Sequence, residues 1–425
     1  MFRKVSKLVC FVLGILMLSG CGAVGKKAAS AGGGGGGGGG DSSSGSSGSS
    51  GGSGSSGPTV ASVSIDAGAA STTTTSVSVA FTTTGTPVEI CIRNDTTVAS
   101  CVWDADITSP NAHTLASGLG SKTVYVWVRD AGGTVSSSGS DTIALSCPTN
   151  FVAVPGSVTY STADFCLAKF EMKAVLISSG TVDADGDITG GNFADYRAEV
   201  RTDGPPWRFV TRAQASNECT ERGWALPTND QWQTVARNVE SVAANWSGLA
   251  VGSGRLAQGN SDGSPAASVS ISDLNDPYDQ TGNAAVQAPG GGWEQRRTHT
   301  LSNNEEIWDL AGNVWEWTSN SIDGSTLNPA LGGNAWREYS DTTYFDFTHT
   351  ANRLLFGPLA DSSTLTYYDS NNGMGTIFGG TGGALSRSGS WQYGTANAGV
   401  FTASLWVQSN FSLNDLGFRC VATVP

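Results

Sequence analysis

The chain has 425 residues, enough for two or three domains. Only 14% of the residues are charged, against about 25% in an average soluble domain, and 57 are glycine. The formal net charge of −13 argues against nucleic acid as a partner and favours divalent cations, because nucleic acids are bound largely through Lys and Arg.

Residues 1–20 have the pattern of a secretory signal peptide. A basic start with Arg3, Lys4 and Lys7 precedes an apolar core over residues 8–18. This core is shorter than the roughly 20 apolar residues that a membrane-spanning helix needs. We therefore predict a leader that is removed.

The leader ends in Leu18-Ser19-Gly20-Cys21, which resembles a lipobox. The resemblance implies that Cys21 carries a diacylglycerol and becomes the first residue of the mature chain; an ordinary leader with a chance cysteine is the alternative. Gly22 rather than Asp follows the cysteine, which by the same resemblance implies sorting to the outer membrane. We expect a lipid-anchored protein of the cell envelope, periplasmic or surface-exposed.

Residues 21–57 have the composition of a disordered tether. From Ala28 to Gly57 the chain is almost wholly Gly and Ser, with nine consecutive glycines from Gly32 to Gly40. Such a segment cannot build a hydrophobic core, and as a random coil it reaches on the order of 25 to 30 Å. It would hold the folded part away from the lipid surface.

Residues 58–146 have the pattern of an all-β module. Apolar and polar side chains alternate over residues 60–65, 76–81, 88–92 and 123–128, as in half-buried strands. The size, the spacing and the closing sequence over residues 126–132 resemble bacterial immunoglobulin-like repeats. We expect an immunoglobulin-like β-sandwich that acts as a spacer.

Cys91 and Cys101 lie on either side of Arg93-Asn94-Asp95-Thr96. A hairpin turn there would place the two cysteines opposite each other on adjacent strands, and an oxidising compartment favours a disulfide. A redox-active pair is the alternative, against which the lack of Cys-x-x-Cys spacing argues.

Residues 147–425 have a different composition, with frequent tryptophans and the first helix signals. Thr211 precedes a helical stretch that ends near Arg222-Gly223, where glycine suits a helix C-cap. Thr228 offers a second capped start, for a helix to about Asn238. We expect a second domain with few helices and long loops.

Four blocks in this second domain resemble the formylglycine-generating enzyme family, also called sulfatase-modifying factor domains. The resemblance implies a compact, irregular α+β fold with a small twisted antiparallel sheet, related to C-type lectins. The blocks are residues 213–232 with Gly223-Trp224-Ala225-Leu226-Pro227-Thr228, then Trp308 to Thr318, Arg387 to Trp391, and Leu416 to Val421.

The resemblance also implies a disulfide. Cys219 and Cys420 stand where the family joins its first helix to its last strand, so we expect that bond here. Cys147 and Cys166 then remain in the domain, and we expect them to pair with each other.

The cysteines of the catalytic relatives are missing. In those relatives a cysteine pair after the Arg-x-Gly-Ser-aromatic block binds copper and oxidises a substrate cysteine to formylglycine. The corresponding residues 390–406 contain no cysteine, which argues against thiolate chemistry and copper there. A sister branch holds iron with three histidines, but this chain has only His113, His299 and His349, so we expect no iron and a structural or surface role for His299 and His349.

The resemblance further implies a calcium site. The family uses side-chain oxygens at the positions of Asp309 and Glu316 and backbone carbonyls at those of Gly312 and Val314. Such hard oxygen ligands suit Ca²⁺. The alternative is that Asp309 only caps a turn and Glu316 is exposed.

Two functions stay open. The first is a non-catalytic lipoprotein for ligand recognition, adhesion or envelope structure, whose protein or glycan ligand would meet the aromatic residues of 336–368 and 391–406. The alternative is a periplasmic or surface oxidoreductase with a non-cysteine active site. We favour recognition, since a fold does not fix a function.

Overall fold

The computed structural model describes residues 57–188, 192–261, 263, 266–270, 295–345, 350–358 and 370–425. The predicted signal peptide, the lipidation site Cys21, nearly all of the tether and His349 lie outside the described residues. Within the described ranges, every helix is too short or too polar to cross a membrane.

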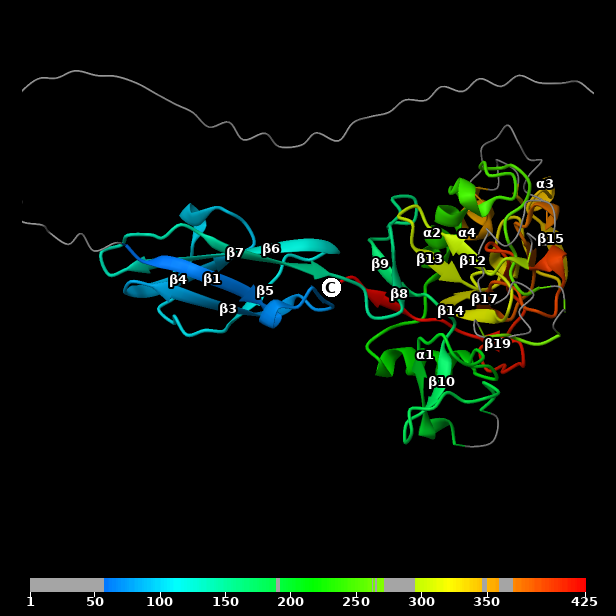
Figure 1. Ribbon diagram of the computed structural model, residues 1–425. Helices are drawn as coiled ribbons and strands as arrows, with labels where there is room; N and C mark the ends of the chain where they lie inside the picture. Colours follow the sequence, from blue (N-terminus) through cyan, green and yellow to red (C-terminus); the bar gives the residue numbers. More distant parts are fainter. Residues whose placement is uncertain are drawn as a thin grey trace, which may run out of the picture. The chain divides into compact units, whose positions relative to one another are not determined.

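The N-terminal β region consists of two sheets (Figure 1). One sheet has the order β1-β3-β5 and the other the order β2-β7-β6-β4. Two short 3₁₀ helices, Asp66–Gly68 and Val98–Ser100, lie in the connections. The strands are β1 Thr59–Ile65, β2 Ser71–Thr72, β3 Ser76–Thr84, β4 Pro87–Arg93, β5 Asn111–Thr114, β6 Gly120–Asp130 and β7 Gly139–Leu145.

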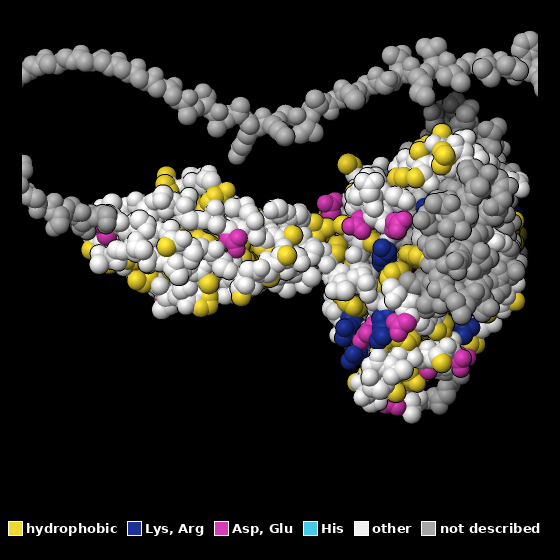
Figure 2. Space-filling model, viewed as in Figure 1, with side chains coloured by type: hydrophobic (Ala, Val, Ile, Leu, Met, Phe, Trp, Pro, Cys, Tyr) yellow, Lys and Arg dark blue, Asp and Glu magenta, His cyan; other side chains and the backbone are white. Residues whose placement is uncertain are grey.

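The alternation in the sequence sets which side chains this region buries. In β3, Val77, Val79 and Phe81 are buried while the residues between them are more exposed. They join buried side chains of β1, β4, β6 and β7 in one hydrophobic cluster. Burying each such side chain contributes about 1.5–3 kcal/mol of transfer free energy. Figure 2 shows few charged side chains on the visible face of this region.

The predicted disulfide between Cys91 and Cys101 is present. Cys91 lies in β4, but Cys101 follows a 3₁₀ helix rather than lying on an adjacent strand. Arg93 supports this turn by donating to Asp95 and, at 2.6 Å, to the carbonyl oxygen of Ser100. The pairing is confirmed, and the chain folds back antiparallel through a bridge between Ile90 and Asp104, but Cys101 does not lie on a strand.

The C-terminal domain is mostly β structure with few helices. Its helices are α1 Arg212–Glu221, α2 Asn229–Glu240, α3 Thr342–Phe345 and α4 Thr350–Phe356. Its strands are β8 Phe151–Val154, β9 Phe165–Ala168, β10 Lys173–Leu176, β11 Tyr196–Glu199, β12 Thr298–Thr300, β13 Glu306–Trp308, β14 Trp315–Ile322, β15 Trp336–Glu338, β16 Thr376–Phe378, β17 Gly383–Arg387, β18 Ala403–Ser404, β19 Leu416–Gly417 and β20 Val421–Thr423.

The two longest helices begin as predicted, and α1 also ends as predicted, whereas α2 continues to Glu240, beyond the expected end near Asn238. Thr211 caps α1 by accepting a hydrogen bond from the Gln214 amide at 3.3 Å. Thr228 caps α2 in the same way, with the Gln231 amide at 3.1 Å. Gly223, with a φ of +75°, follows α1. Such capping boxes satisfy amide groups that the first helical turn leaves without partners.

The largest sheet of the domain has the order β15-β16-β18-β17-β14-β19. Most neighbours in it are antiparallel, but β14 pairs with β19, and β16 with β18, in parallel. A separate three-stranded sheet, β20-β9-β8, pairs the first strands of the domain with its last one. Helix α2 packs against α4 (Figure 1).

Both predicted disulfides of this domain are present. Cys219 in α1 is bonded to Cys420, which precedes β20, over a sequence separation of 201 residues. Cys147 is bonded to Cys166 in β9. The second of these bonds ties the start of the domain to the sheet β20-β9-β8.

Tryptophans form much of the core. Trp207, Trp232, Trp246 and Trp317 are fully buried. The indole N–H groups of Trp232 and Trp317 donate to backbone carbonyls at 2.8 Å. Buried indoles of this kind bury a large apolar area without leaving the N–H group unpaired.

Candidate functional site

The segment from Asp309 to Glu316, which the sequence predicts as a calcium site, connects β13 to β14 and is buried along its whole length. Its turn requires glycine at position 312. Gly312 has a φ of +74°, and a Cβ there would lie 2.5 Å from the carbonyl oxygen of Gln258 and 2.6 Å from that of Asn260. Local packing therefore fixes this backbone.

Both carboxylates of the segment are paired with arginines. Arg297 donates to both oxygens of Asp309, at 2.6 and 2.5 Å. Arg419 donates to both oxygens of Glu316, with its Nε at 2.5 Å from Oε2. All four side chains are almost completely buried. The alternative that Glu316 is exposed is therefore wrong.

This arrangement does not fit a calcium ion. A cation at Glu316 would lie beside the guanidinium group of Arg419, and the Gly312 carbonyl accepts a hydrogen bond from the Ser388 hydroxyl at 3.0 Å. Calcium needs several oxygen ligands that are free to face it. Within the described ranges no group of three or more His, Cys, Asp or Glu side chains is arranged to hold a metal. A calcium site at Asp309, Gly312, Val314 and Glu316 is therefore a prediction from the family resemblance that these contacts do not support.

We expect a chelator to leave the melting temperature unchanged, because the arginines already balance the charges of Asp309 and Glu316. The measurement is elemental analysis of the purified protein, combined with thermal melts in calcium, copper and chelator. About one equivalent of calcium with a chelator-sensitive melting temperature would instead support the calcium prediction. Stoichiometric copper or iron would favour the oxidoreductase alternative.

Two further buried charges adjoin this segment. Glu171 accepts hydrogen bonds from the Asn313 side-chain amide at 2.6 Å and the Val314 amide at 3.2 Å. Burial, and next the Asp309 carboxylate, raise the pKa of Glu171 well above its usual value. Burial also lowers the pKa of Lys173 to about 8. The resulting charge cluster has three acidic and three basic members: Glu171, Asp309, Glu316, Lys173, Arg297 and Arg419.

His299 lies in β12, in the core of the domain. It is fully buried, and its Nε2 lies 3.0 Å from the carbonyl oxygen of Ala257. Burial, with the nearby charge of Arg296, lowers the pKa of His299 to about 3, so that the ring is neutral at physiological pH. His113 lies in β5 of the N-terminal region.

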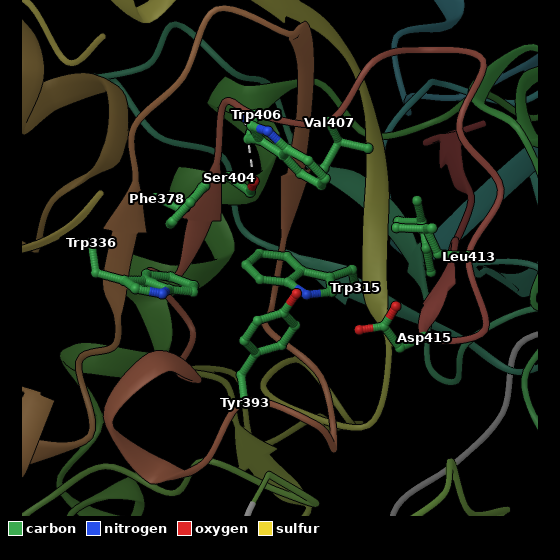
Figure 3. A pocket seen from close by; sticks show the side chains of 10 residues that line it. Trp315, Trp336, Phe378, Tyr393, Ser404, Trp406, Val407, Leu413 and Asp415 are labelled. Atoms are coloured by element: carbon green, nitrogen blue, oxygen red, sulfur yellow. Dashed lines mark hydrogen bonds between the residues drawn. The ribbon is translucent and has the colours of Figure 1, made fainter. Parts of the chain in front are cut away.

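A pocket of about 210 Å³ lies against the six-stranded sheet (Figure 3). Trp336 of β15 pairs with Phe378 of β16, which pairs with Ser404 of β18, so their side chains share one face. Trp406 and Tyr393 come from the loops that follow β18 and β17. The lining is Trp315, Trp336, Phe378, Tyr393, Ser404, Trp406, Val407, Leu413, Asp415 and Leu416.

The aromatic rings of the pocket touch one another in a continuous series. The ring centroids of Trp336 and Phe378 are 4.9 Å apart, and those of Trp315 and Tyr393 are 5.8 Å apart. Trp336 also lies within 5.7 Å of Tyr393. The rims stay open, since Tyr393 is 40% and Trp406 42% exposed. Large apolar groups exposed around a concave site are typical of binding sites.

Asp415 supplies the one carboxylate among the lining residues. The Ser390 hydroxyl donates to its Oδ2 at 2.8 Å. Burial raises the pKa of this carboxyl, against the hydrogen bond from Ser390. The pKa of Tyr393 is likewise raised, first by burial and then by the Asp415 charge.

The sequence pointed to part of this pocket. The aromatic stretches 336–368 and 391–406 were expected to meet a ligand, and Trp336, Tyr393 and Trp406 line the pocket together. Residues 346–349 and 359–368 of the first stretch lie outside the described residues. Phe378 and Asp415 were missed, because strand pairing brings them in and no local motif marks them.

The comparisons with known proteins bear on the C-terminal domain. The family model for the sulfatase-modifying factor enzyme 1-like domain matches residues 184–424, more than half of the chain. No curated protein matches the chain.

Similar solved structures include two variants of a major tropism determinant. The P3c variant is 12% identical over 82% of this chain and 81% of that chain, with a TM-score of 0.29. The I1 variant is also 12% identical over the same shares, with a TM-score of 0.28. At such low scores the likeness does not bear on function. The family match, which covers more than half of the chain, shows that the chain belongs to the family with a sulfatase-modifying factor enzyme 1-like domain.

Proposed function

We propose that the C-terminal domain is a non-catalytic recognition head that binds its ligand in the aromatic pocket. The observation that carries the proposal is the open rim, where Trp406 and Tyr393 are about two-fifths exposed over an apolar cavity. Exposing two large rings to water costs free energy that a bound ligand would recover. The cysteine-free segment 390–406 supports a binding role over the oxidation that catalytic relatives perform.

The rest of the chain fits a role in display. In this proposal a lipid on Cys21 anchors the protein in the outer membrane, and the Gly- and Ser-rich tether of residues 21–57 follows. The N-terminal β region would be an immunoglobulin-like spacer, and the head would have a fold related to C-type lectins. The ligand would be a protein or glycan of the envelope or of another cell.

Replacing Trp406 with alanine is expected to weaken ligand binding at least about tenfold, since truncating a tryptophan that a ligand covers typically costs about 2 kcal/mol or more. The measurement is binding of the full-length protein to arrays of glycans and envelope peptides. Trp103→Ala is the matched control, because Trp103 is partly exposed but lies in the N-terminal β region. Equal binding by wild type and Trp406→Ala would refute the proposal.

A further inference from the structure

We propose that the aromatic pocket takes a methylated ammonium group, with the rings against the methyl groups and Asp415 facing the positive charge. This inference rests on the proposed function, since it names the chemical class of ligand for the same pocket. It depends on three properties of the pocket, which are its rings, its single carboxylate and its small number of other polar groups.

The rings suit a cation. A positive group within about 6 Å of an aromatic centroid is attracted by the ring's electrons, most strongly over tryptophan. Three of the lining residues are tryptophans, and the Trp315 and Trp336 rings lie nearly parallel, with centroids 6.4 Å apart. Figure 3 shows the Trp406 ring across the cavity from Trp315 and Tyr393. A group that enters between them would contact several ring faces or edges.

The carboxylate of Asp415 has no cationic side chain paired with it among the described residues. Arg208, whose charge acts on Asp415, donates instead to the carbonyl oxygens of Asn414 at 3.1 Å and Asp185 at 2.5 Å. Asp415 is only 3% exposed, so its negative charge is largely desolvated. A buried carboxylate in this state gains most from a ligand that brings a positive charge. The acidic chain, at −13, also attracts cations.

The scarcity of polar partners selects among cations. A primary ammonium group has three N–H donors and a guanidinium group has five, and each must find an acceptor when it is buried. Beside the Asp415 carboxylate, the lining has side-chain oxygens only on Ser404 and Tyr393, and the Ser404 hydroxyl accepts from the Trp406 amide at 3.4 Å. A fully methylated ammonium group has no N–H donors, so it fits without leaving any unpaired. A sugar would leave most of its hydroxyls without partners.

The test compares choline with its neutral tert-butyl isostere, which has the same shape without the charge. Tryptophan fluorescence and calorimetry on the full-length protein would follow the binding. We expect choline to bind about tenfold or more tightly than the isostere, a ratio in line with a partly desolvated cation–π site. Asp415→Asn should lose about tenfold in affinity for choline and leave the affinity for the isostere unchanged.

The controls separate this inference from the proposed function. Glu221→Gln removes an exposed carboxylate from the end of α1 and should not change choline binding. The wild-type comparison of the two ligands holds even if Asp415→Asn folds poorly. Equal binding of choline and the isostere, or binding only of a neutral glycan with loss in Trp406→Ala, would overturn the cation assignment and leave recognition by the pocket intact. If no array ligand and neither choline nor its isostere binds in a Trp406-dependent way, both proposals fail.

Discussion

Replacing Arg419 with alanine is expected to lower the free energy of unfolding of the C-terminal domain by about 3–5 kcal/mol. The Arg419 guanidinium is completely buried and donates to both oxygens of Glu316. It also donates to the carbonyl oxygens of Ala168 at 3.1 Å, Trp308 at 3.1 Å and Asp309 at 2.9 Å. Its removal leaves a buried carboxylate without its partner, and burial already raises the pKa of Glu316. Denaturant unfolding measures the loss.

Arg201→Ala is the matched control for this prediction. Arg201 pairs with Asp203 at 2.8 Å, but both side chains are substantially exposed, so the loss should stay below about 1 kcal/mol. A second variant removes both charges of the buried pair, through Arg419→Met with Glu316→Leu. It should recover most of the lost stability, because no buried charge is then left unpaired. A small loss in Arg419→Ala would show that the pair contributes little.

Removing the bond between Cys219 and Cys420, by replacing both with serine, is expected to cost up to about 5 kcal/mol of unfolding free energy. The bond closes a loop with a sequence separation of 201 residues, and long loops lose the most entropy when they are closed in the unfolded chain. Both sulfurs are buried, so two hydroxyl groups would also have to be accommodated in the core. Denaturant unfolding of the oxidised proteins measures the difference.

The bond between Cys91 and Cys101 provides the comparison. Its sequence separation is 10 residues, for which the same entropic argument gives about 3 kcal/mol. Replacing this pair should affect the N-terminal β region and leave the unfolding of the C-terminal domain unchanged. Equal losses from the two pairs would show that loop length does not set the stabilisation.

Short sequence motifs predicted the helix starts and the strands whose structure depends on neighbouring residues. Thr211 and Thr228 mark helix starts because their hydroxyls meet amides three residues further on, within the reach of a short motif. The alternation in β3 and β6 likewise predicted two of the main strands of the N-terminal region. By contrast, β5 contains Asn-Ala-His-Thr, which has little strand character and is held by pairing with β3.

The residues of the candidate site also fall into those that a local motif marks and those that only the fold brings together. The acidic residues Asp309 and Glu316 were recognisable from the family motif, but their partners Arg297 and Arg419 lie 12 and 103 residues away. Nothing near either arginine in the sequence indicates which carboxylate it meets. Asp415 likewise has no local sequence signal, since it lines the pocket only because β19 pairs with β14. Long-range pairing of this kind depends on the whole fold.

Residues 419–423 also set the order in which the described parts of the chain can fold. Arg419 forms an ion pair with Glu316, and Cys420 is bonded to Cys219. Strand β20 pairs with β9, so all three contacts reach residues far upstream in the sequence. While the polypeptide emerges, the N-terminal β region has all its strands long before the C-terminal domain has its final ones. That domain cannot complete the pairing of its buried acidic groups or its apolar core until residues 419–423 have been synthesised. A chain truncated before Arg419 would therefore lack the ion pair, the disulfide and the strand pairing that complete the C-terminal domain.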